Sequence, residues 1–124
     1  MEGVSYSLQD CLGVFGEMGI TADEMLACGG GGSSPFWRKM LADLYGCPVK
    51  TVSSKEGPAL GVALLAGVGT GIYANVQEAC SAVIRVDKEV QPEQDNHLRY
   101  QKVYHLYRQL YPALQEQFQS LSNL

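Results

Sequence analysis

The spacing of apolar and polar residues predicts that the chain alternates between helices and strands. Apolar side chains between residues 8 and 15 recur every three or four positions, which predicts an amphipathic helix over residues 5 to 18. A short apolar run at 24–28 is bounded by turn residues and fits a buried strand. A second apolar stripe, from Trp37 to Leu44, predicts another helix that should end near Gly46.

The second half of the chain continues this alternation. Its expected elements are a strand at 48–52, an Ala- and Gly-rich helix from Pro58, a short helix from Asn75 to about Val83, an edge strand at 84–90 and a long helix from Pro92. Tyrosines and leucines recur at helical spacing along the last helix, which favours a core face, and Pro112 should kink or restart that helix. The order strand, helix, strand, helix implies a parallel pair. We therefore expect an α/β fold with few parallel strands and several helices.

Four consecutive glycines, residues 29–32, stand between the predicted strand and the next helix. Ser34 is a good N-cap for that helix, and Pro35 suits its first position. Glycines ahead of a helix N-terminus let an anion approach the backbone, and Arg38 and Lys39 would favour a phosphate there. The run matches neither the P-loop nor the dinucleotide fingerprint, so a flexible turn without a ligand, a hinge or a linker remain alternatives to a phosphate or nucleotide contact.

Composition and charge narrow the class of protein. The 124 residues suffice for one domain or part of one, and 46% of them are hydrophobic. The formal net charge of -4 includes no basic block, which argues against nucleic-acid and membrane-surface partners. The most apolar stretch, 58–74, is too short and too rich in glycine for a membrane span, so we interpret it as a buried helix of a soluble protein. No signal peptide is visible, which predicts a cytoplasmic protein.

The other reactive side chains form no recognisable catalytic or metal-binding pattern. The four cysteines lack metal-ligand spacing and are predicted to be buried free thiols. His97 and His105 are expected to be solvated or capping residues, and Glu56 is expected to be structural. Asp43 lies late in its helix, where a negative charge is unfavourable, which indicates a specific hydrogen-bond partner.

The stretch "GGGGSSPFWRKMLADLYGCPV" resembles "GGGAKSPLWRQMLADIFGCPV" of the xylulokinases, which belong to the sugar-kinase family named for its F-G-G-Y motif. The resemblance continues through "EGPALGVALLAGVGTGIYANVQEAC" and "QPEQDNHLRYQKVYHLYRQLYPAL", and it covers nearly the whole chain. Members of that family have two actin-like, or ribonuclease-H-like, domains. They transfer the γ-phosphate of ATP to a sugar hydroxyl in the cleft between these domains, with Mg²⁺ at the phosphates.

The resemblance implies that the glycine motif contacts ADP or ATP. By position, Gly29 and Gly30 match the pair that approaches the nucleotide, Gly31 continues the turn, and Ser34 matches the polar residue near the adenosine. The chain departs from the quoted pattern at Gly32 and Ser33, which replace a small residue and a lysine, and at Lys39, where glutamine is common. Any contact from a lysine at position 33 is therefore lost.

The same resemblance implies that residues 1–124 are the C-terminal portion of the second, nucleotide-binding domain, and hence a partial actin-like domain. Neither D-x-G phosphate motifs nor an F-G-G-Y segment occurs in the chain. The catalytic base, the Mg²⁺ ligands and most sugar contacts should therefore lie outside it, and the chain alone should be inactive. Two alternatives stay open: a non-catalytic interaction or oligomerisation module, and a kinase for another pentose or a polyol. Unpaired sheet edges and exposed apolar faces would favour a homodimer.

Overall fold

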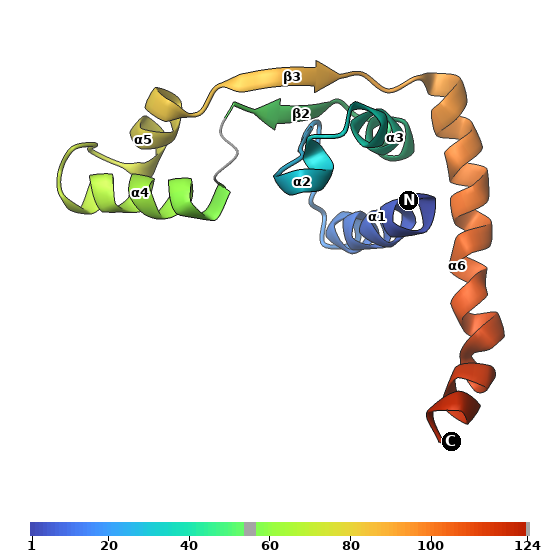
Figure 1. The fold of residues 1–124 in the computed structure, drawn as a ribbon. Coiled ribbons are helices and arrows are strands. Elements are labelled where there is room, and N and C mark those ends of the chain that lie inside the picture. Colours follow the sequence, from blue (N-terminus) through green and yellow to red (C-terminus); the bar gives the residue numbers. More distant parts are fainter. Residues whose placement is uncertain (54–56, 124) are drawn as a thin grey trace.

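A computed structural model describes residues 1–53 and 57–123, which form six helices and three strands (Figure 1). The elements are α1 (Glu2–Glu17), β1 (Met25–Leu26), α2 (Gly29–Gly32), α3 (Pro35–Tyr45), β2 (Val49–Val52), α4 (Gly57–Gly69), α5 (Val76–Val83), β3 (Val86–Val90) and α6 (Gln94–Ser122). The predicted mixed α/β class is confirmed. Glu56, for which we expected a structural role, lies outside the described residues.

The three strands form one sheet in the order β1-β2-β3. β1 and β2 are parallel, with Met25 opposite Val49, because α3 carries the chain back between them. β3 runs antiparallel to β2, with Val90 opposite Val49 and an irregularity in the register between Thr51 and Val52. The parallel pair and the edge strand that the sequence predicts are therefore both present.

Helix α3 is the centre of the fold, and its ends are those that the sequence predicts. The Ser34 hydroxyl accepts a hydrogen bond from the Trp37 N–H at 3.3 Å, and Pro35 occupies the first turn. Gly46 ends the helix in the left-handed conformation, with φ at 72°. The buried face of α3 packs on the sheet around Val49, and its residues Leu41, Ala42 and Leu44 are buried.

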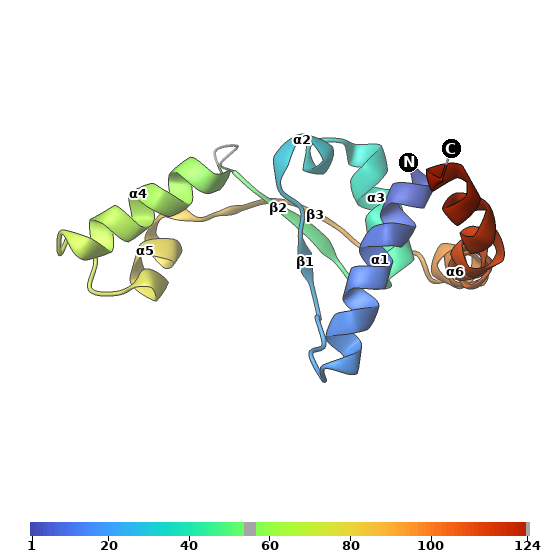
Figure 2. The ribbon, with the colours of Figure 1, turned by 90° about the horizontal axis from the view of Figure 1, so that it is seen from below.

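Helices α1 and α6 lie beside α3 (Figure 2), and a tyrosine cluster joins them to each other. The Tyr6 ring of α1 lies 5.2 to 6.3 Å from the rings of Tyr100, Tyr104 and Tyr107. Burial, reinforced by a hydrogen bond to Asp10, raises the pKa of Tyr104 to about 12.

The C-terminal part of α6 does not share in this packing. The helix continues through Pro112, and its last turns bend away from the rest of the helix (Figure 2). Tyr111 is 64% exposed, and its ring stacks on that of Phe118 in the same helix, with ring centroids 6.1 Å apart. The predicted core face of α6 is therefore only partly present: the tyrosines near its start are half-buried against α1, no described residue of the helix is fully buried, and the face is exposed near its end.

Helices α4 and α5 pack mainly against each other and lie at the far end of the sheet from α6 (Figure 1). Asn75 caps α5, as its side-chain oxygen accepts the Glu78 N–H at 2.8 Å. We expected α4 to be buried, which is wrong for most of its surface: only Leu64 and Gly67 are buried, whereas Val62 and Leu65 are more than 60% exposed. One neighbouring helix covers only one face of it.

Two further expectations of burial are wrong. Leu26 in β1 is 56% exposed, because β1 is an edge strand of two residues. The four cysteines are free, but Cys11 and Cys28 are exposed and the other two are only partly buried. Apolar residues next to a cysteine in the sequence therefore do not ensure that its thiol faces the core.

Candidate functional site

A cleft of about 440 Å³ lies where the chain leaves β1 and β2. This is the edge of the sheet at which the two parallel strands end, the usual place for ligands in open α/β sheets. Its described lining residues are Ala27, Cys28, Gly29, Gly30, Gly32, Ser33, Arg38, Thr51, Val52, Ser53, Asp87 and Lys88. The walls thus come from the glycine run, the end of β2 and the start of β3.

The glycine run forms one turn of helix, α2, rather than the flexible turn, hinge or linker that the sequence left as alternatives. Gly29 enters it with φ at 74°, in the left-handed region where a side chain would be strained. A Cβ added at Gly29 or Gly30 would meet no atom within 4 Å, and both residues line the cleft. The backbone of these two glycines is therefore open to a ligand.

The next two glycines are constrained by packing instead. A Cβ at Gly31 would lie 1.9 Å from the Trp37 ring, and one at Gly32 would lie 2.8 Å from the Ala27 carbonyl oxygen. Only glycine fits at either position without a shift of the neighbouring atoms. Gly29 and Gly30 therefore face the cleft with open space in front of them, whereas Gly31 and Gly32 let α2 pack closely, although Gly32 also lines the cleft.

The four predicted nucleotide-binding residues are divided in the same way. Gly29 and Gly30 line the cleft, whereas Gly31 and Ser34 are not among its described lining residues. Gly31 lies against Trp37, and the Ser34 hydroxyl accepts the Trp37 N–H at the start of α3.

Sequence reasoning did not find the polar residues on the opposite wall of the cleft. Thr51 and Ser53 come from the end of β2, and Asp87 and Lys88 come from β3. Polar residues at the carboxyl end of a predicted strand could have indicated Thr51 and Ser53. The contribution of β3 depends on its antiparallel register with β2, for which the sequence offered no signal.

Arg38 brings a positive charge to the cleft. Although it is charged, its side chain is buried, with only 4% of the residue exposed. Its guanidinium donates a hydrogen bond to the Gly32 carbonyl oxygen at 2.6 Å. The Nε atom is buried and has no hydrogen-bond partner among the described residues.

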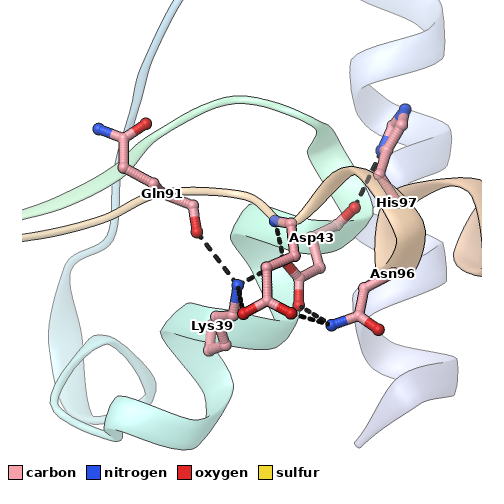
Figure 3. Close-up of polar contacts among 6 residues, drawn as sticks. Lys39, Asp43, Gln91, Asn96 and His97 are labelled. Atoms are coloured by element: carbon pink, nitrogen blue, oxygen red, sulfur yellow. Dashed lines mark hydrogen bonds and ion pairs between the residues drawn. The ribbon is translucent and has the colours of Figure 1, made fainter.

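Lys39 does not take part in the cleft, although its position in α3 suggested a phosphate contact. Its ammonium group lies 2.9 Å from a carboxylate oxygen of Asp43 and 2.9 Å from one of Glu93 (Figure 3). Burial alone would lower the pKa of Lys39, but the hydrogen bonds and charges of these two carboxylates outweigh it and raise the pKa.

Asp43, for which the sequence indicated a specific hydrogen-bond partner, joins α3 to α6 (Figure 3). Besides Lys39, it accepts the Glu93 backbone N–H at 2.7 Å and the Asn96 side-chain N–H at 3.1 Å. A carboxylate at the start of α6 is favourable, because helix N–H groups there are otherwise unpaired.

The last carbonyl groups of α3 are also paired with α6. The His97 ring nitrogen Nδ1 lies 2.9 Å from the Asp43 carbonyl oxygen, and the Gln101 side chain donates to the Leu44 carbonyl oxygen at 3.0 Å. The prediction of His97 as a capping residue is confirmed. We call Lys39, Asp43, Glu93, Asn96 and His97 the α3–α6 clasp.

The described part of the chain has neither a cluster of metal-binding side chains nor a helix suited to span a membrane. Residues 1–53 and 57–123 contain no group of three or more His, Cys, Asp or Glu side chains arranged to hold a metal ion. Within the same ranges, no helix has the length and apolar character needed to cross a membrane.

Comparison with known proteins gives consistent matches. A family model described as "FGGY family of carbohydrate kinases, C-terminal domain" matches residues 1–70. The chain is 32% identical to a xylulose kinase of Staphylococcus epidermidis over 111 aligned residues. This alignment covers 90% of this chain and 22% of the relative. It is 36% identical to an autoinducer-2 kinase of Salmonella choleraesuis over 93 aligned residues, and this alignment covers 75% of this chain and 18% of that relative.

A solved structure agrees with these sequence matches. The crystal structure of a xylulose kinase from Rhodospirillum rubrum superposes with a TM-score of 0.81 at 24% identity, over 95% of this chain and 24% of that one. The fold is therefore shared, and the chain spans less than a quarter of the length of the relatives that it matches.

Proposed function

The chain belongs to the FGGY family of carbohydrate kinases, and on that basis we propose that residues 1–124 are the C-terminal portion of the nucleotide-binding domain of such an enzyme. In this proposal the chain binds ATP and ADP, and sugar, catalytic base and magnesium ligands come from the rest of the kinase. Since ATP is the co-substrate, we place the enzyme in the cytoplasm.

The observation that carries the proposal is the open backbone of Gly29 and Gly30 at the cleft. Phosphoryl transfer depends mainly on positioning and on neutralising the charge of the phosphates. Backbone N–H groups without side chains in front of them can approach phosphate oxygens closely. We propose that the Gly29–Gly30 backbone holds the nucleotide phosphates in this way, with Gly31 and Ser34 supporting the turn rather than touching the ligand.

The residues of the cleft fit a phosphate better than they fit a metal ion. Asp87 is the one carboxylate among its described lining residues, whereas Arg38 and Lys88 are both positive. A nucleotide would bring Mg²⁺, which neutralises phosphate charge, but the magnesium ligands would have to come from outside this chain. We therefore expect the purified chain to release no ADP from ATP and D-xylulose in a coupled assay.

For the sugar we propose D-xylulose, converted to its 5-phosphate, because the proteins named xylulose kinase match over 90% of the chain. The alternative substrate is another pentose or a polyol. This alternative stays open because the chain also matches an autoinducer-2 kinase, a relative named for a different substrate. Assays of the complete enzyme with a panel of sugars would decide between them.

The test of nucleotide binding compares two glycines that both have open space in front of them. Gly30 lines the cleft, whereas Gly16 lies on α1. We expect weak ADP binding by the chain, seen by NMR as shifts of the Gly29 and Gly30 amides. Gly30→Leu should weaken this binding at least tenfold and Gly16→Leu should leave it unchanged. Equal ADP affinity of the two variants would refute the site.

A second candidate function is an interaction module, which the exposed apolar residues of α6 favour. Large apolar side chains that are more than 40% exposed occur from Leu106 to the end of the helix: Leu106, Leu110, Tyr111, Leu114, Phe118 and Leu121. Apolar patches of this kind favour association, and we propose that the chain pairs with a second copy of itself as a homodimer. A dimer that forms without any affinity for ADP would favour this function over the first.

A further inference from the structure

Arg38 is an unusual residue because its charge is buried and incompletely paired. The residue is 4% exposed, and none of the ion pairs formed by the described residues includes it. Its hydrogen bond to the Gly32 carbonyl oxygen leaves the buried Nε atom without a partner in the described part of the chain. A buried charge of this kind is costly unless an opposite charge compensates it.

The position of the side chain indicates where that opposite charge would lie. Arg38 lines the cleft together with Gly29 and Gly30, and its bond to Gly32 fixes it beside the same glycine turn. Lys88 adds a second positive charge to this cleft. The one described carboxylate there, Asp87, has an oxygen 4.0 Å from the Lys88 ammonium group. The charge of the cleft is thus suited to an anion.

We propose that Arg38 is a ligand of the nucleotide phosphates, an assignment that rests on the proposed function of the cleft. A planar guanidinium offers donors whose spacing matches phosphate oxygens, and it stays charged at every physiological pH. A phosphate here would accept a hydrogen bond from the guanidinium and neutralise its buried charge. The glycine backbone and Arg38 would then bind one phosphate group from two sides.

If Arg38 binds the phosphates, its removal should weaken the binding of ADP and not that of adenosine, which has no phosphate. We would measure ADP and adenosine binding to the 124-residue chain by NMR titration. The variants are Arg38→Gln, Arg38→Lys and a matched control, Arg99→Gln, whose side chain is exposed on α6. Arg38→Gln should lower ADP affinity at least tenfold and leave adenosine affinity unchanged, so that the preference for ADP disappears. Arg99→Gln should behave as the unmodified chain.

Arg38→Lys keeps the charge but loses the planar donors, so its ADP affinity should fall by about threefold to tenfold. This variant decides the question if Arg38→Gln does not fold, as judged by circular dichroism. Unchanged ADP affinity in the folded Arg38 variants, with weakened binding in Gly30→Leu, would overturn the role of Arg38 and leave the nucleotide site standing. Absence of ADP binding by the unmodified chain would overturn both.

Discussion

Replacing Asp43 with asparagine should destabilise the fold more than any exposed charge change, because it opens the α3–α6 clasp. The carboxylate is buried and accepts three hydrogen bonds, from Lys39, from the Glu93 backbone and from Asn96. An asparagine side chain has a single acceptor oxygen, and its NH₂ group would face donors. The change therefore removes at least one hydrogen bond and leaves Glu93 as the one carboxylate paired with Lys39 among the described residues, beside the Gln91 carbonyl oxygen.

The size of the effect follows from these contacts. A hydrogen bond to a charged group contributes about 1.5–3 kcal/mol, and opening a buried ion pair from one side costs about 3–5 kcal/mol. Because Lys39 keeps its partner Glu93, we expect the free energy of unfolding to fall by about 3 kcal/mol for Asp43→Asn. This is a large part of the roughly 5–15 kcal/mol that stabilises a typical domain.

The assay is urea unfolding, followed by the fluorescence of Trp37, the one tryptophan of the chain. The matched control is Asp95→Asn in the first turn of α6, whose side chain is exposed. It should change the free energy of unfolding by less than about 1 kcal/mol, the range for a charge near an exposed helix end. Equal small effects of the two variants would refute the view that the clasp stabilises the fold.

Three further predictions follow from the packing. Gly31→Ala should destabilise the chain by about 1–3 kcal/mol, because its Cβ would overlap the Trp37 ring, whereas Gly30→Ala should cost less than about 1 kcal/mol in urea unfolding. The pKa of Tyr104 is raised from 10.0 to about 12, so its contribution to the free energy of unfolding is complete below pH 10 and is lost as the pH rises through 12. Tyr104→Phe should therefore flatten the dependence of the free energy of unfolding on pH between these values. An unchanged dependence would contradict this prediction. Leu110→Glu should lower the average mass in light scattering across a dilution series, and a monomeric mass of the unmodified chain at all concentrations would exclude the homodimer.

Local signals in the sequence predicted most of the secondary structure. Ser34, Gly46 and Asn75 end or begin helices where they were expected, because a cap depends on residues within one turn of it. The parallel pair of strands could also be predicted, since a helix between two strands imposes it. These features need no knowledge of how distant segments pack.

The details of the site depend on distant segments, and the sequence could not supply them. Gly30 and Gly31 are adjacent and identical, yet only the position of the Trp37 ring separates a glycine open to the cleft from one closed by packing. A charged residue such as Arg38 is expected at the surface, whereas this side chain is buried and bonds to the Gly32 carbonyl oxygen of the glycine turn. The unfavourable position of Asp43 indicated a partner, but its partner Glu93 lies 50 residues further along the chain.

Helices α4 and α5 form an insertion between the paired strands β2 and β3, and this insertion is a place where the chain can be cut or extended. The polypeptide leaves the sheet after β2 and returns to it at β3, and the Ser53 N–H bonds to the Arg85 carbonyl oxygen at 3.0 Å where the two ends meet. A break at the tip, between Gly71 and Asn75, would leave both strands paired. New termini or a foreign domain could therefore be introduced there, and two separate polypeptides divided at this tip should reassemble into the same sheet.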